Sequence, residues 1–342
     1  MSSRPLSLEQ LLVLQVRAPL TESCERWIAE LLNVPENLTG NNHRLNLLTR
    51  IADHILQVHP SALQGLEEQL FHLNKGKAEA LAHDHSARER QFAASWFYSR
   101  AATAAEVLYN NTQDISWAER WYEINRLSGE IAQGLNPPDV RHAAHRYGFM
   151  GKAAQTIFER NNDATWAKRW YQAEMLSAQL SSEKKHQATS YGKAGKAARQ
   201  LFFITDDINW TEKWYEAASA ASELHAENFS QSFEYTSAGE AAKFLSKRTR
   251  NLLWAERWYN AEVAAAQRSG EKHAARCSGL AGDAAASLFE ATRELVWAQK
   301  ALEAYKQYLN YATKHPGFGI FNLVRRIESQ VDRLERYARN AS

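Results

Sequence analysis

The feature that most constrains the fold is a segment that occurs five times, each time beginning with tryptophan. The copies read WAERWY, WAKRWY, WTEKWY, WAERWY and WAQKAL, and they begin at Trp117, Trp166, Trp210, Trp254 and Trp297. Successive tryptophans are 49, 44, 44 and 43 residues apart. The longest interval contains Pro137 and Pro138, which end a helix and belong to a loop. A repeat of about 44 residues predicts stacked structural units in place of one closed core.

A second motif begins fifteen residues before each of these tryptophans. Its first residue is always small, and the five copies start at Ala102, Gly151, Gly195, Gly239 and Gly282. In the third copy Tyr191 stands four residues before Gly195 and Phe202 stands seven after it, which places all three on one face of an α-helix. Glycine inside a helix costs about 1 kcal/mol relative to alanine. Its recurrence therefore predicts that the backbone of another helix lies too close for a β-carbon.

Each unit is expected to contain two helices. The first carries the small-residue motif, and the second begins at the tryptophan, with Ser116 and Asn209 as candidate N-caps that have glutamate three residues later. The tryptophans and the following alanine-rich run give the second helix a wide apolar stripe that a single hairpin cannot cover. We therefore expect an α-solenoid in which antiparallel helical hairpins bury these stripes against each other.

Composition and the extent of the repeats divide the chain into three parts. Only 7 prolines and 15 glycines occur in 342 residues, which favours an all-α fold over one rich in turns. The tryptophan repeats span 86–314. Residues 1–85 lack the motif, and they are expected to form either an N-terminal helical cap or degenerate repeats. Residues 315–342 alternate apolar residues with arginine at helical spacing, which predicts a C-terminal capping helix.

The hairpin unit resembles the tetratricopeptide-repeat superfamily. The resemblance rests on glycine and alanine at the contact positions, a tyrosine on the first helix and WYxA on the second, as in the copy that starts at Trp214, and it covers roughly 86–314. The long period is more similar to the SNAP-type vesicle-fusion adaptors. The resemblance implies a right-handed superhelix that binds a protein or peptide in its groove. It transfers no functional residue to this chain.

Charge and motif content favour a non-enzymatic scaffold or adaptor. The 41 basic and 39 acidic residues leave a net charge of +2, so no global field attracts nucleic acid or anionic lipid. Cys24 and Cys277 lack a CxxC context, which predicts a reducing, cytoplasmic location. The segment 191–198, YGKAGKAA, lacks the spacing of a phosphate-binding loop. We expect no cofactor, no catalytic residue and no membrane span, and the sequence leaves the oligomeric state open.

Partner-binding residues are expected where the copies differ while the buried face stays constant. The positions one and four residues after the small residue meet this condition, because they are polar and variable. In the middle units they are Lys152, Gln155, Lys196, Arg199, Glu240 and Lys243. The charge changes from basic toward acidic along the repeats. An extended protein or peptide partner would therefore meet a graded surface.

A row of basic residues recurs three positions after the first tryptophan of each repeat. The row consists of Arg120, Arg169, Lys213, Arg257 and Lys300. The favoured interpretation is that each cation covers the neighbouring indole, which contributes about 0.5–1 kcal/mol when exposed. A phosphate backbone could use the same row. This gives one alternative function, a regulatory module that associates with nucleic acid through the row and the arginine-rich C-terminal helix.

Histidines suggest the second alternative, a metal-dependent enzyme. His142, His186 and His273 each stand nine residues before a motif glycine, and His145 lies one helical turn from His142. His142 and His145 are therefore the weak candidates for metal ligands, with His83 and His85 as a further local pair. The favoured interpretation is that a half-polar residue suits the start of the helix, and we expect no metal.

Overall fold

The computed structural model describes residues 64–82, 88–315 and 321–341. Within these ranges the chain forms twelve α-helices and no β-strand, which confirms the predicted all-α class. The helices are α4 (Gln64–Ala82), α5 (Arg88–Thr112), α6 (Ile115–Gly134), α7 (Val140–Asn161), α8 (Ala164–Leu180), α9 (Lys184–Thr205), α10 (Ile208–Leu224), α11 (Asn228–Thr249), α12 (Leu252–Gln267), α13 (Glu271–Thr292), α14 (Leu295–Lys314) and α15 (Phe321–Ala341).

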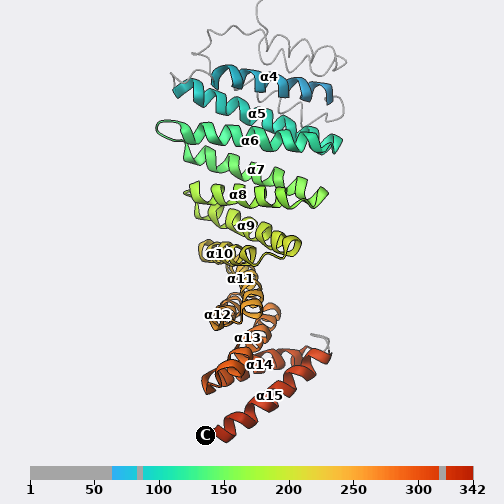
Figure 1. Ribbon diagram of the computed structural model, residues 1–342, viewed down its shortest axis with the longest axis vertical. Helices are drawn as coiled ribbons and strands as arrows, with labels where there is room; N and C mark the ends of the chain where they lie inside the picture. Colours follow the sequence, from blue (N-terminus) through green and yellow to red (C-terminus); the bar gives the residue numbers. More distant parts are fainter. Residues whose placement is uncertain (1–63, 83–87, 316–320, 342) are drawn as a thin grey trace, which may run out of the picture.

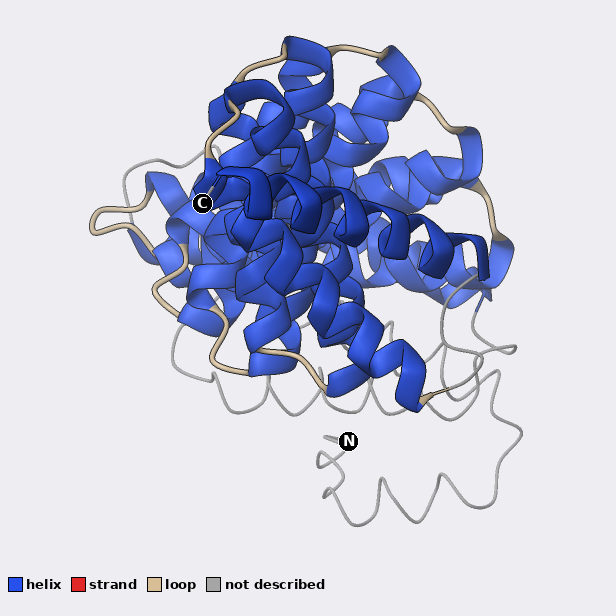
Figure 2. Cartoon of the chain, turned by 90° about the horizontal axis from the view of Figure 1, so that it is seen from below, coloured by secondary structure: helices blue, strands red, loops and turns tan. Residues whose placement is uncertain are grey.

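The helices are stacked in the order of the sequence. Each one packs mainly against the helix before it and the helix after it. Figure 1 shows an open pile with α4 and α15 at opposite ends, in which the direction of the helix axes turns along the pile. Figure 2 looks along the pile from the end at which α15 lies. The expected stack of hairpins is present, and the described helices contact mainly their neighbours in the sequence.

We number the five hairpins units 1 to 5: α5–α6, α7–α8, α9–α10, α11–α12 and α13–α14. The first helix of a unit is its A-helix and the second is its B-helix. Two residues join them in every unit. The first residue of the turn has φ between 52° and 61°, and these residues are Gln113, Asn162, Asp206, Arg250 and Arg293. The second residue is the N-cap of the B-helix.

The N-cap residues correct the expected helix starts. Asp114 accepts a hydrogen bond from the backbone N–H of Ser116, and Asp207 accepts one from Asn209, so both B-helices begin two residues earlier than predicted. Asp163 and Asn251 cap units 2 and 4 in the same way. An aspartate carboxylate at this place satisfies a free amide and complements the positive end of the helix dipole.

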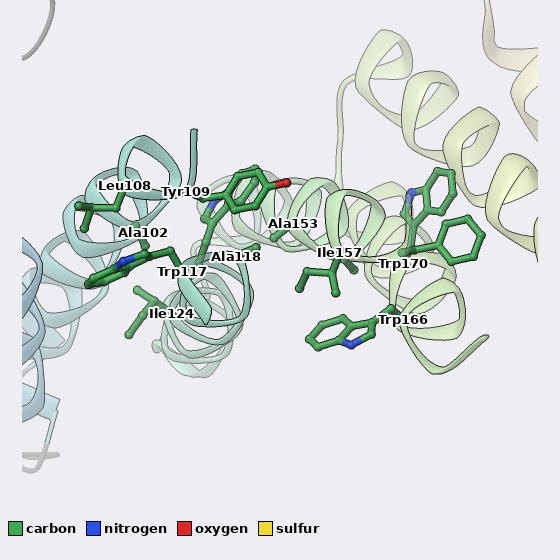
Figure 3. Packing of buried hydrophobic residues seen from close by; sticks show 14 of the residues in the cluster. Ala102, Leu108, Tyr109, Trp117, Ala118, Ile124, Ala153, Ile157, Trp166 and Trp170 are labelled. Atoms are coloured by element: carbon green, nitrogen blue, oxygen red, sulfur yellow. The ribbon is translucent and has the colours of Figure 1, made fainter. Parts of the chain in front are cut away.

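The second tryptophan, which the first four repeats have, lies at the centre of the core. Trp121, Trp170, Trp214 and Trp258 are at most 3% exposed, and most of the alanines around them are fully buried. Small alanine side chains let the helices approach closely, so that the large indoles fill the remaining space. Figure 3 shows one part of this core, where Ile157 of α7 lies beside the ring of Trp166 of α8.

Two of the motif glycines make room for a buried carboxyl group and not for a helix backbone. A β-carbon on Gly151 would lie 2.7 Å from Oε1 of Glu174, and one on Gly239 would lie 2.7 Å from Oε1 of Glu262. Each glutamate lies on the B-helix of the same unit, eight residues after the first tryptophan. The expectation of a close backbone approach is therefore wrong at these glycines.

The remaining motif glycines differ from each other. Gly282 faces the ring of Tyr305, whose atoms would lie 2.5 Å from an added β-carbon. At Gly195 the facing residue is Ala218, and its backbone nitrogen is the nearest atom, at 3.5 Å. A distance of 3.5 Å is an ordinary van der Waals contact, so a β-carbon would fit at Gly195, and the predicted exclusion of a β-carbon by a neighbouring backbone is wrong there as well.

The two ends of the described chain also pack against the units. α4 packs on α5, while residues 1–63 of the expected N-terminal region lie outside the described residues. α15 lies in the segment expected to cap the C-terminus. It buries Ile327 and Leu334, and its outer arginines reach back to α13, where Arg326 pairs with Asp283 at 2.9 Å.

Replacing Trp214 by alanine should lower the free energy of unfolding by about 3–5 kcal/mol, because a fully buried indole is lost and a cavity remains. Urea denaturation followed by circular dichroism measures this change. Val296→Ala is the control. Val296 is 47% exposed, and its truncation should change the stability by less than about 0.5 kcal/mol. Equal denaturation midpoints for Trp214→Ala and the original chain would contradict this account of the core.

Gly239→Ala should destabilise the chain by about 1–3 kcal/mol, because the new methyl group overlaps the carboxyl group of Glu262. Glu262→Ala removes that overlap and gives unit 4 the alanine that unit 3 has at Ala218. The double variant should therefore be more stable than the sum of the two single changes predicts. A double-mutant cycle in urea measures the coupling, and strictly additive effects would show that the pair does not interact.

Candidate binding surface

Aromatic rings on the B-helices join neighbouring units. The tyrosine of one unit packs edge-on against the first tryptophan of the next, with ring centroids 5.1–5.6 Å apart. The pairs are Tyr122–Trp166, Tyr171–Trp210, Tyr215–Trp254 and Tyr259–Trp297. Phe71 of α4 takes the place of the tyrosine against Trp117. Edge-to-face pairs contribute about 0.5–1.5 kcal/mol each beyond their area burial.

The predicted basic row covers these aromatic joints. Each cation lies 4.1–4.4 Å from the centroid of the first tryptophan of its own unit. It also lies 5.2–5.9 Å from the aromatic ring that the preceding helical layer contributes. The interpretation that Arg120, Arg169, Lys213, Arg257 and Lys300 cover indoles is therefore confirmed. A phosphate backbone would have to compete with two aromatic rings at each cation.

Three of the six predicted binding residues form a second row of cations over indoles. Lys152 lies 5.5 Å from the ring centroid of Trp121, Arg199 lies 5.3 Å from that of Trp214, and Lys243 lies 5.0 Å from that of Trp258. These side chains shield the buried tryptophans at the edge of the core. Their positions are thus subject to a packing constraint that the sequence pattern does not reveal.

Ion pairs link predicted binding residues on successive A-helices. Nζ of Lys152 lies 2.8 Å from Glu106 of unit 1, and Arg199 lies 3.1 Å from Glu240 of unit 4. Gln155 donates a hydrogen bond to Glu159 of its own helix. Lys196 is exposed, and its charge acts on the half-buried Glu234. The six residues therefore lie along one layer, but the structure pairs several of them with each other or with neighbours.

The histidines contact hydroxyl groups of preceding helices. The Nε2 atoms of His142, His186 and His273 lie 3.2, 2.9 and 3.2 Å from the hydroxyl oxygens of Ser99, Ser177 and Thr236, respectively. Burial lowers the pKa of all three imidazoles, which keeps them neutral at pH 7.

The weak metal candidates do not converge on one point. His142 faces Ser99 of α5, whereas the ring of His145 packs against His186 of α9 with centroids 4.9 Å apart. No group of three or more histidine, cysteine, aspartate or glutamate side chains among the described residues is arranged to hold a metal ion. His83 and His85 lie outside the described residues.

Two buried glutamates are functional candidates that the motif analysis missed. Glu174 and Glu262 are 0% and 1% exposed. Burial raises the pKa of Glu174 to about 7, against the opposing effect of Lys193, whose Nζ lies 3.7 Å from Oε1. Burial likewise raises the pKa of Glu262 to about 8, and Cys277 lies beside it. The signal in the sequence is a glutamate on the otherwise apolar stripe of the B-helix.

The described cysteine is not an activated thiol. Cys277 is buried, and burial together with the nearby Glu262 raises the pKa of its thiol to about 12. A thiol with this pKa is protonated at pH 7 and is a poor nucleophile. Cys24 lies outside the described residues.

The comparisons with known proteins give no family. No protein-family model and no curated protein matches the chain. A solved structure described as the computational design of self-assembling cyclic protein homooligomers is similar at 14% identity over 82% of this chain and 95% of its own, with a TM-score of 0.17. At that TM-score the likeness carries no argument. None of the helices in the described ranges combines the length and apolar character that a membrane crossing requires.

The stability of the chain should fall as the pH rises from about 4.5 to about 8. The reason is the burial of Glu174 and Glu262. In the unfolded chain both carboxyl groups lose their protons near pH 4.5, whereas in the folded chain they keep them until the pH reaches about 7 for Glu174 and about 8 for Glu262. Glu262→Gln keeps the shape of the side chain and removes its ionisation. The loss of stability with rising pH should therefore be smaller in this variant by roughly 3 kcal/mol.

Urea denaturation at several pH values between 5 and 8 measures this effect. The difference between variant and original chain removes the contributions of the histidines, whose lowered pKa values act in the opposite direction. Glu223→Gln, at an exposed site on α10, is the control and should leave the pH dependence unchanged. Parallel curves for Glu262→Gln and the original chain would contradict the assignment.

Proposed function

We propose that this chain is a non-enzymatic scaffold or adaptor that binds a protein or peptide segment along its A-helices in the cytoplasm. In this proposal the stack is a right-handed solenoid of TPR-like hairpins with a period of about 44 residues. The groove of that solenoid holds the partner.

One observation carries the proposal: the repeated residues maintain the stack, while the exposed A-helix faces vary. Tryptophan, tyrosine and the first basic row recur at the B-helix joints in almost every unit. In contrast, the A-helices expose Phe92 on α5, Phe149 on α7 and Phe233 on α11, at 50%, 37% and 53%. Variable exposed aromatic residues among charged residues are typical of surfaces that recognise other proteins.

The chemistry of the titratable groups also supports a scaffold. The thiol of Cys277 has a raised pKa, and the three aligned histidines are bonded to hydroxyl groups of neighbouring helices. Glu174 and Glu262 lie between helices within the core. These groups serve contacts between units, and they do not meet in an arrangement of nucleophile, base and orienting group.

Panning a phage-displayed library of random dodecapeptides against the full chain tests the proposal. We expect peptides to be recovered and to compete with one another for the A-helix face. Phe149→Asp should weaken their binding about tenfold, which corresponds to the loss of one apolar contact. Leu176→Asp is the matched control, because Leu176 is 36% exposed on the B-helix α8. Recovery of no peptide, or equal loss in both variants, would contradict the proposal.

A further inference from the structure

Positive charge is concentrated on two neighbouring A-helices. α9 contains five lysine or arginine residues and no acidic residue, and α7 contains four basic residues with Glu159 as its single acid. The net charge of the chain is only +2, so the rest of the sequence is net negative. The excess on α7 and α9 is therefore a local feature of the stack.

Four of these cations form a regular array. Arg141 and Lys152 on α7 are exposed, and so are Lys185 and Lys196 on α9. Within each helix the two residues are eleven positions apart, which is three helical turns, so they lie on the same face about 17 Å from each other. The pairs occupy equivalent positions of units 2 and 3. Phe149 lies within the same stretch of α7, 37% exposed.

The α9 side of the array has unused charge. Arg141 pairs with Glu183 at 3.0 Å, and Lys152 pairs with Glu106 at 2.8 Å. Among the described residues, neither Lys185 nor Lys196 forms a salt bridge, and the charge of Lys196 acts on the half-buried Glu234 of α11. When the carboxylates of a ligand bind such exposed lysines, they form charge-assisted hydrogen bonds, which are stronger than hydrogen bonds between neutral groups.

The row of basic residues at the Lys196 position ends at α9. The positions equivalent to Lys196 on the next two A-helices are Glu240 on α11 and Asp283 on α13. A long polyanion such as RNA that followed the stack would meet these carboxylates. A short ligand is confined to the two basic helices. The 17 Å between the cations of one helix corresponds to about five residues of an extended chain.

We propose that the A-helix face of α7 and α9 binds an acidic peptide segment of about five residues, whose carboxylates meet Lys185 and Lys196. An apolar side chain within the segment contacts Phe149. This inference rests on the proposed scaffold function and specifies the partner as an acidic segment. It also shifts the site from Arg199 and Lys243, which cover indoles, to the exposed lysines.

The dodecapeptide library separates the two claims. Enrichment of aspartate and glutamate among the selected peptides supports an acidic partner. Selection of peptides without such enrichment leaves the scaffold function standing and overturns this inference. Recovery of no peptide overturns both.

A direct measurement uses fluorescence anisotropy with a labelled peptide that contains five consecutive acidic residues and one phenylalanine. Lys185→Glu with Lys196→Glu should weaken binding about tenfold or more, which is at least 1.4 kcal/mol. Lys168→Glu with Lys314→Glu makes the same charge change at exposed sites on the B-helices α8 and α14, and it should leave the affinity unchanged. Equal affinities of the two double variants would overturn the site.

Charge reversal of the ligand guards against a folding defect. A peptide with lysine in place of the acidic residues should bind the Lys185→Glu, Lys196→Glu variant more tightly than it binds the original chain. Failure of this exchange would overturn the electrostatic assignment. A labelled oligouridine serves as the nucleic-acid probe. If it bound more tightly than the acidic peptide, and if the Lys185→Glu, Lys196→Glu variant lost this binding, the face would be assigned to nucleic acid. That result would also overturn the proposed acidic peptide site.

Discussion

The structure depends on the contact between a tyrosine of one unit and the first tryptophan of the next. Each unit leaves an indole edge uncovered until its neighbour supplies a ring, and a basic side chain then closes the joint from outside. The ring pair and the cation together contribute about 1–2.5 kcal/mol per joint. Because each joint links only adjacent units, stability is built from nearest-neighbour terms, as expected for a one-dimensional stack.

Within a unit, the pairing of a small residue with a larger one sets how the two helices fit. Gly151 and Gly239 accommodate the carboxyl groups of Glu174 and Glu262, whereas Gly195 faces Ala218, where an added β-carbon would make only ordinary van der Waals contacts. The motif glycine thus makes room for a buried carboxyl group in units 2 and 4, whereas unit 3 has no such group at the facing position. The carboxyl groups make the interior partly polar, and they remain protonated at a pH where exposed glutamates are charged.

Much of this architecture could be predicted from the sequence, because spacing along a helix is a local property. The interval between tryptophans predicts the hairpins, and the basic residue three positions later predicts the cation over the indole. The partner of a helix face is not a local property. Nothing in the repeat shows that Gly151 faces Glu174, or that Lys152 and Arg199 lie over Trp121 and Trp214. The N-caps lie two residues before the predicted positions, because Asp114 and Asp207 have a charged carboxylate that also complements the positive end of the helix dipole.

The buried glutamates make the order of the units matter. Glu174 lies against Lys193 and Ser190 of the following A-helix. Excising the 44 residues 184–227 would join α8 to α11 and bring Glu234 into the place of Ser190. The carboxyl groups of Glu174 and Glu234 would then lie in the same buried interface, without the lysine that Glu174 contacts in the full chain. The units resemble one another, but they cannot be exchanged freely. A shortened chain would need a compensating substitution at the new interface between α8 and α11.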